Sequence, residues 1–239
     1  MSVYIGSARI DERGKALGGE AGDQKQQTIT DYSGEVSQQK FYVSTKGWVV
    51  LRPNSVDVAT ALAGSMIQAC NNKNIGYDQG NRYDILKHGT NSKVKTECDC
   101  SSLVRQCVIE ATGKDPGDFN TANEASVLQK TGAFKRFDYS TGTTLYTGDI
   151  LVTKTKGHTV IVTMGAARSL SDEKYYYPIY SGNTTSIVTA LKSVGEMDTS
   201  YAHRKRIAYT NSLLTYSGTA SQNTTLLNLL KQGRLLKSK

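Results

Sequence analysis

The fold is decided by Asp99-Cys100-Ser101-Ser102-Leu103-Val104, read together with Gly157-His158-Thr159-Val160-Ile161-Val162 further along the chain. The first stretch places a cysteine at the expected start of a helix, and the second places a histidine at the expected start of a strand. The N-terminus of a helix favours the thiolate form of a cysteine, and a neighbouring imidazole can remove the thiol proton. The two stretches therefore predict a nucleophile, Cys100, and its base, His158.

Two nearby cysteines compete with Cys100 for the role of nucleophile. Cys107 falls two turns into the expected helix, on the apolar face that also carries Leu103, so a core position is predicted for it. Cys98 precedes the helix by two residues and is expected to point elsewhere. Cys100 is therefore the predicted nucleophile.

Apolar spacing and β-branched residues outline an α+β fold around these stretches. The expected helices cover residues 55–70, 100–112, 121–130, 186–194, 201–209 and 225–230. The expected strands cover residues 149–153 and 158–164, with shorter β-like pieces at 3–10 and 41–44. A polar break at 165–174 separates a predicted catalytic domain, residues 1–167, with helices packed on an antiparallel sheet, from a small helical module, residues 175–239.

The charge is unevenly spread over these two parts. The net charge is +8; residues 168–239 carry ten Lys or Arg against four Asp or Glu, a net of +6, and residues 1–167 carry nineteen against seventeen, a net of +2. A basic surface of this kind favours a polyanion such as nucleic acid, an anionic lipid face or an anionic wall polymer. The aromatic cluster at 175–177 precedes the basic run at 204–206 without interleaving with it, and no nucleic-acid recognition motif is present, so nucleic acid is not expected.

The remaining composition narrows the class further. Four cysteines, three of them within ten residues, do not predict a disulfide framework, and the three histidines are too scattered for zinc-finger spacing. The sequence contains no long apolar run that would predict membrane insertion. Its first residues show no basic segment followed by an apolar stretch. We therefore expect no metal or cofactor, and synthesis in a host cytoplasm without a signal peptide.

The combined pattern resembles the NlpC-type papain-like peptidoglycan peptidases, with the CHAP amidases and peptidases as relatives. The resemblance runs from about residue 75 to residue 164 and places Cys100 on the family nucleophile and His158 on its base. Tyr77 resembles the tyrosine that these proteins place close to the nucleophile, and we expect it to bind substrate. The resemblance implies an amide hydrolase that forms an acyl-enzyme and needs no cofactor.

The sequence departs from that family at the third catalytic group. A polar residue on the strand after the histidine strand normally orients the imidazole, but here the chain is expected to leave the domain soon after residue 164. The segment 3–10 could supply the missing strand in a permuted arrangement, with Glu12, Asp23 or Gln24 as the orienting residue; Asp23 is the preferred candidate. Ser181 and Asn183 are the alternatives if residues 174–180 form the next strand.

The C-terminal part resembles the wall-binding modules of bacteriophage lysins and related cell-wall hydrolases. The matching pattern runs from Tyr175-Tyr176-Tyr177-Pro178 to Leu229-Leu230-Lys231-Gln232-Gly233. Its positive charge suits anionic wall polymers, which would concentrate an enzyme on its insoluble substrate. The leading expectation is a peptidoglycan hydrolase that cleaves the stem peptide. An N-acetylmuramoyl-L-alanine amidase of the same fold and a non-catalytic wall-binding protein remain open.

Overall fold

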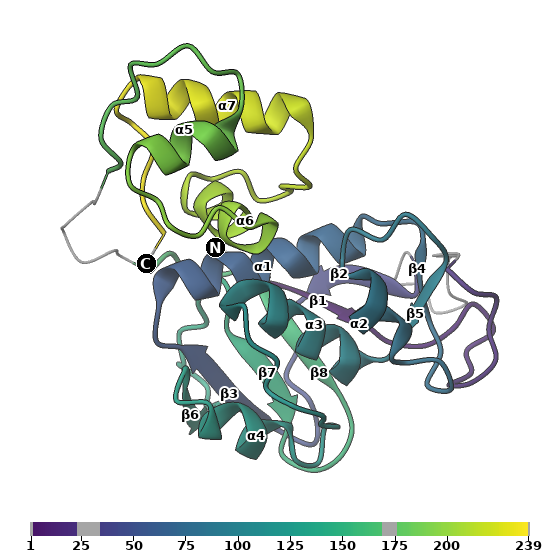
Figure 1. The fold of residues 1–239 in the computed structure, drawn as a ribbon. Coiled ribbons are helices and arrows are strands. Elements are labelled where there is room, and N and C mark those ends of the chain that lie inside the picture. Colours follow the sequence, from purple (N-terminus) through teal and green to yellow (C-terminus); the bar gives the residue numbers. More distant parts are fainter. Residues whose placement is uncertain (1, 23–33, 169–175, 239) are drawn as a thin grey trace.

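The computed structural model describes residues 2–22, 34–168 and 176–238, which form an α+β fold (Figure 1). The strands are β1 (Tyr4–Ala8), β2 (Val36–Lys40), β3 (Trp48–Pro53), β4 (Ile75–Tyr77), β5 (Thr96–Cys98), β6 (Phe134–Asp138), β7 (Ile150–Thr153) and β8 (Thr159–Met164). The helices are α1 (Val56–Cys70), α2 (Asp84–His88), α3 (Cys100–Thr112), α4 (Glu124–Lys130), α5 (Ile187–Ser193), α6 (Tyr201–Thr210) and α7 (Ala220–Lys231). The expected α+β class is confirmed.

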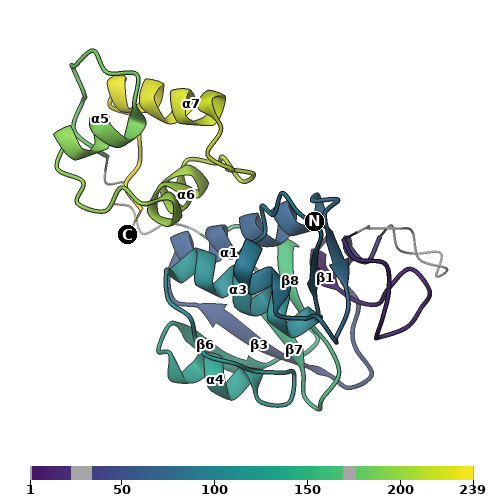
Figure 2. The same cartoon turned by 45° about the vertical axis from the view of Figure 1, so that its right-hand side comes forward.

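Six strands make one antiparallel sheet in the order β2-β1-β8-β7-β3-β6, and β4 and β5 form a separate parallel pair. Successive side chains of a strand point to opposite faces. On β7, Ile150 and Val152 belong to the large core on one face, whereas Leu151 belongs to a smaller cluster with Trp48. The large core lies between the sheet and the helices α1 and α3, which cover that face (Figure 2).

The two core helices begin and end where local chemistry predicts. Ser55 caps α1 by accepting a hydrogen bond from the amide of Val58. Asp99 caps α3 in a reciprocal box with Ser102, and Gly113 ends that helix with a positive φ of 73°. Because these signals lie within a few residues of each helix end, both helices were predicted correctly.

The N-terminal strand joins the sheet beside β8, as the permuted arrangement predicts. β1 pairs antiparallel with β8 on one side and with β2 on the other. The expected β piece at 41–44 is wrong: β2 ends at Lys40, and Phe41 only donates one backbone hydrogen bond to Val3. The alternative strand at 174–180 lies partly outside the described residues. Residues 176–180 form only an isolated bridge, between Tyr176 and Leu236, and β8 has β1 and β7 as its neighbours.

The C-terminal helices α5, α6 and α7 form a separate layer that meets the rest of the chain through α6 and α1 (Figure 1). Tyr209 of α6 lies so close to Gly64 of α1 that a Cβ on that glycine would sit 2.7 Å from its ring. Lys205 of α6 is buried and forms an ion pair with Glu110 of α3. The three short helices were predicted, with α7 longer than expected.

Candidate functional site

Cys100 is the first residue of α3, and its side chain is almost buried, with 9% of the residue exposed. Burial, with the negative charges of Asp99 and Glu124, raises the pKa of the Cys100 thiol to about 12. Backbone hydrogen bonds from Thr159 and Ser101 act in the opposite direction and favour the thiolate. The backbone amide of Thr159, the residue that follows His158, is therefore one of the groups that favour the thiolate of Cys100.

The two competing cysteines occupy structural positions, as predicted. The Cys98 thiol donates a hydrogen bond to the carbonyl of Gly76 at 3.4 Å, and Cys107 is fully buried in the core face of α3. Burial raises the pKa of both thiols well above the ordinary value. All four cysteines are free thiols. Of these four cysteines, Cys100 is the one that lies in the first turn of a helix.

His158 directly precedes β8, and its backbone is held on both sides by Thr153. Its amide donates to the Thr153 hydroxyl at 2.9 Å, and its carbonyl accepts from the Thr153 amide at 3.0 Å. Burial, and the positive charge of Arg9, lower the pKa of the imidazole to about 4. The ring is therefore neutral near neutral pH and can accept a proton.

Ser7 is the residue that the sequence reasoning missed. Its hydroxyl oxygen lies 3.2 Å from Nε2 of His158 and is brought there by the pairing of β1 with β8. Ser7 is also 1% exposed, a polar side chain within an otherwise apolar buried strand. That isolated polar position on β1 is the signal that could have identified it.

The other candidates for the orienting residue lie elsewhere. Glu12 accepts hydrogen bonds from the amide of Glu20, and Asp23 and Gln24 lie outside the described residues. Ser181 and Asn183 lie in the segment that leads into α5, within the C-terminal layer. The expected segment 3–10 therefore does reach His158, and the residue within hydrogen-bond distance of Nε2 is Ser7.

Tyr77 ends β4 and is buried close to the nucleophile. Burial, followed by the charge of the Cys100 thiolate, raises the pKa of its phenol. Its hydroxyl accepts a hydrogen bond from Nε2 of Gln79 at 2.9 Å. Tyr77 is therefore close enough to Cys100 to interact with it electrostatically, and its role in substrate binding stays a prediction; Gln79 is a further polar group at this position.

An arginine on the segment before α2 holds the start of α3. Nε of Arg82 lies 2.8 Å from Oδ2 of Asp99, and Nη2 donates to the hydroxyl of Ser101 at 3.0 Å and to the carbonyl of Phe119 at 2.9 Å. Both residues that flank Cys100 are thus fixed by one guanidinium. This contact could not be predicted from the sequence, because Arg82 lies outside the motif.

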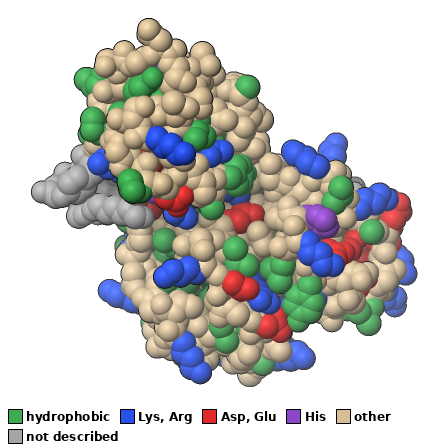
Figure 3. All heavy atoms as spheres, viewed as in Figure 1, with side chains coloured by type: hydrophobic (Ala, Val, Ile, Leu, Met, Phe, Trp, Pro, Cys, Tyr) green, Lys and Arg blue, Asp and Glu red, His purple; other side chains and the backbone are tan. Residues whose placement is uncertain are grey.

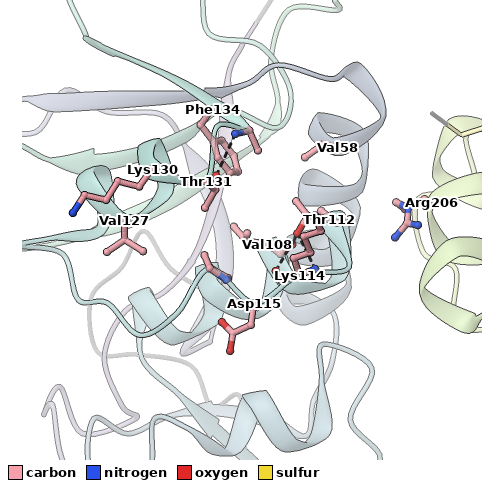
Figure 4. A pocket seen from close by; sticks show the side chains of 13 residues that line it. Val58, Val108, Thr112, Lys114, Asp115, Val127, Lys130, Thr131, Phe134 and Arg206 are labelled. Carbon is pink, nitrogen blue, oxygen red and sulfur yellow. Dashed lines mark hydrogen bonds between the residues drawn. The ribbon is translucent and has the colours of Figure 1, made fainter.

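A pocket of about 590 Å³ lies away from these residues, between α1, the C-terminal end of α3, α4 and α6 (Figure 4). Its apolar walls include Val108 and Phe134, and Lys114, Lys130 and Arg206 stand at its edges. Neither Cys100 nor His158 lines it. This pocket is therefore separate from the predicted nucleophile and base.

Within the described residues 2–22, 34–168 and 176–238, no group of three His, Cys, Asp or Glu side chains is arranged to hold a metal ion. None of the helices in the same ranges is both long enough and apolar enough to cross a bilayer.

Comparison with known proteins places this site in a family. The endolysin-like domain family matches residues 5–169 of this chain. That range contains Ser7, Tyr77, Cys100 and His158. An L-alanyl-D-glutamate peptidase of Listeria phage A118 is 38% identical over 73 residues, which are 30% of this chain and 25% of that protein. The chain thus spans about a quarter of that relative's length. No solved structure was found to match.

Proposed function

Because the chain belongs to the endolysin-like domain family, we propose that it is a peptidoglycan hydrolase that cleaves an amide bond of the stem peptide with Cys100 as nucleophile. The observation that carries the proposal is the junction of α3 and β8. There the backbone amide of Thr159 favours the Cys100 thiolate, and Nε2 of His158, the residue before Thr159, lies 3.2 Å from the hydroxyl of Ser7. The sheet and helix arrangement around this junction supports a papain-like, NlpC-type enzyme.

The proposed mechanism follows from the protonation states of the two groups. Burial raises the pKa of the thiol and lowers that of the imidazole, so both are neutral in the resting site. His158 takes the thiol proton as the sulfur attacks the amide carbon. Backbone amides at the start of α3 stabilise the oxyanion. The protonated imidazole then gives its proton to the departing amine, which leaves an acyl-enzyme for water to hydrolyse.

The neighbouring residues take supporting roles in this proposal. Ser7 orients the imidazole in place of the expected Asp23, because its hydroxyl is within hydrogen-bond distance of Nε2. Tyr77 borders the space in front of Cys100 and contacts the substrate. The charge of residues 168–239, together with their resemblance to wall-binding modules, supports the attachment of this part to anionic wall polymers. The site of action is then the bacterial cell wall.

Turbidity of purified bacterial walls, with mass spectrometry of the released muropeptides, tests the proposal. Cys100→Ala should abolish lysis and retain binding to the walls, whereas Cys70→Ala, at a half-buried cysteine outside the site, should lyse normally. New termini within the stem peptide would support the endopeptidase, and a free N-acetylmuramoyl lactyl group would identify the amidase instead. Equal lysis by Cys100→Ser and the natural protein would overturn the cysteine mechanism, and binding without lysis by the natural protein would identify a non-catalytic binder.

A further inference from the structure

A buried carboxyl group lies beside the proposed nucleophile and has no role in the mechanism above. Glu124 is the first residue of α4 and is fully buried. Its Oε1 accepts a hydrogen bond from the hydroxyl of Thr159 at 2.6 Å. Its Oε2 is buried without a hydrogen-bond partner among the described residues. Burying a carboxyl oxygen without a hydrogen-bond partner costs free energy of folding, so the buried position of Glu124 calls for an explanation.

Thr159 connects this carboxyl group to the reacting groups. The hydroxyl of Thr159 donates a hydrogen bond to Glu124, and the backbone amide of the same residue is close enough to Cys100 to favour its thiolate. On the other side of His158, the amide of Gly157 donates to the hydroxyl of Thr121 at 3.0 Å. The chain at the start of α4 therefore holds the residues on both sides of the proposed base.

The charges around Glu124 are predominantly negative. Asp99 and the Cys100 thiol are close enough to interact with it electrostatically, and burial with the charge of Asp99 raises the pKa of Glu124 to about 8. A carboxyl in this setting is neutral at neutral pH.

No cation from the neighbouring strands compensates that charge. Lys135 and Arg136 of β6 are exposed, and Arg52 of β3 is paired with Asp149. His158 is neutral near neutral pH, as described above. Arg82 is paired with Asp99 at 2.8 Å, so its charge is shared with that carboxylate. Among the described residues, the hydroxyl of Thr159 is the group that donates a hydrogen bond to Glu124.

We propose that Glu124 is a positioning residue for the Cys100–His158 pair: its neutral carboxyl group fixes Thr159 against the Cys100 sulfur, and its ionised form opposes the thiolate. The inference rests on the proposed function only in taking Cys100 as the nucleophile. It predicts that the hydrogen bond and the charge of Glu124 have opposite effects on thiolate formation. If Glu124 only stabilised the fold, removing its charge and removing its hydrogen bond would not have opposite effects on the thiolate.

The rate of alkylation of Cys100 by iodoacetamide, followed by peptide mass spectrometry between pH 6.5 and 9, tests this proposal without any wall substrate. Thr159→Val removes the hydroxyl and keeps the amide, and should slow alkylation about three- to tenfold at every pH. Thr159→Ser is the matched control and should react at the natural rate. Glu124→Gln keeps an acceptor oxygen without the charge, so it should match the natural protein at pH 6.5 and react about three- to tenfold faster at pH 9.

The outcomes separate this proposal from the proposed function. If the ratio between Glu124→Gln and the natural protein is the same at pH 6.5 and pH 9, the carboxyl charge does not act on the thiol and the inference is overturned. If Thr159→Val reacts like Thr159→Ser, the hydrogen bond does not position the amide. Either result leaves the proposed function intact, since that stands or falls on the lysis of walls by Cys100→Ala. Thermal unfolding of each variant verifies that it is folded.

Discussion

At the scale of single residues, removing the contact between Ser7 and His158 tests most directly how the imidazole is oriented. Ser7→Ala removes the hydroxyl at 3.2 Å from Nε2 without adding bulk to a buried strand. We expect kcat on walls or soluble muropeptides to fall about tenfold, because one hydrogen bond that selects the ring orientation is lost. Ser37→Ala, at the buried serine opposite Ser7 on β2, is the control and should retain full activity. Equal losses in both variants would contradict the orienting role.

The low pKa of His158 predicts that activity persists to an unusually low pH. Because burial lowers the pKa of the imidazole to about 4, the ring stays able to accept a proton well below pH 6, and kcat/KM should fall only as the pH drops towards 4. Folding stability should also decrease between pH 6.5 and 4, because in this window the unfolded chain binds a proton that the folded site does not. Proton NMR titration of the His158 ring measures the pKa directly. A midpoint near 6.5 in the folded protein would refute the prediction.

The proposed nucleophile and base could be singled out from the sequence because each lies beside a local structural signal. Cys100 follows a capping residue at a helix start, and His158 precedes a β-branched strand. Ser7 could not be identified in this way, because it is 151 residues from His158 in the chain and meets it only through the register of β1 on β8. A strand's own pattern does not encode its partner's register. The strand was therefore predictable, and Ser7 could be singled out only as an isolated polar position on it, not as the partner of His158.

At the scale of elements, the start of α3 combines helix capping with control of the thiol. Asp99→Ala removes the capping box and the partner of Arg82, so we expect a loss of about 1–2 kcal/mol in the free energy of unfolding. The same change removes a negative charge that raises the pKa of Cys100, so the thiol should become more reactive towards iodoacetamide. Urea unfolding and alkylation rates measure the two effects. Ser55→Ala at the cap of α1 should show only the loss of stability; increased thiol reactivity there would contradict the charge argument.

Elements with local signals were predicted, and elements defined by their surroundings were not. The helices α1 and α3 carry caps and a three- to four-residue apolar spacing, which short-range chemistry fixes. β3 was missed because Trp48-Val49-Val50-Leu51 is buried on both faces and shows no alternation. β6 was missed for the opposite reason, since it is a largely exposed edge strand whose only neighbour in the sheet is β3.

At the scale of the whole molecule, the structure shows that the basic residues of the C-terminal part do not all lie at the surface. Lys205, from the basic run at 204–206, is buried and therefore unavailable to a polymer. Lys192 and Lys231 at the ends of α5 and α7 are exposed. On the face shown in Figure 3, Lys and Arg side chains are spread over both parts of the molecule. The proposed contact with anionic wall polymers therefore depends on exposed lysines and not on the basic run as a whole.

Charge reversal tests that contact. The double change Lys192→Glu and Lys231→Glu should weaken binding to purified walls, reduce its dependence on salt, and leave cleavage of small soluble muropeptides unchanged. The control is Lys135→Glu with Arg136→Glu, which reverses two exposed charges on β6 of the catalytic part. Co-sedimentation with walls at several salt concentrations gives the affinities. If the two double variants bind equally well, residues 176–238 do not direct wall attachment.

The buried ion pair between Lys205 and Glu110 joins the C-terminal layer to α3. Glu110 also accepts hydrogen bonds from Ser65 at 2.7 Å and from the amide and hydroxyl of Thr90 at 2.8 and 2.7 Å. Lys205→Met would leave this carboxylate buried without its cation, so we expect a loss of about 3–5 kcal/mol in the free energy of unfolding. Lys231→Met, on the surface of α7, should change it by less than about 0.5 kcal/mol.

The same pair gives the docked layer a defined dependence on pH. Although burial opposes ionisation, the charge of Lys205 and the hydrogen bonds to Glu110 together lower the pKa of this carboxyl to about 2. A carboxyl with a lowered pKa contributes stability above its unfolded value, and that contribution is lost as the pH falls from about 4.5 towards 2. Urea unfolding at pH 7, 4 and 3 should therefore show the difference between the natural protein and Lys205→Met shrinking with acid. A difference that stays constant over this range would mean that α6 is held on α1 and α3 by apolar packing, with the ion pair adding nothing.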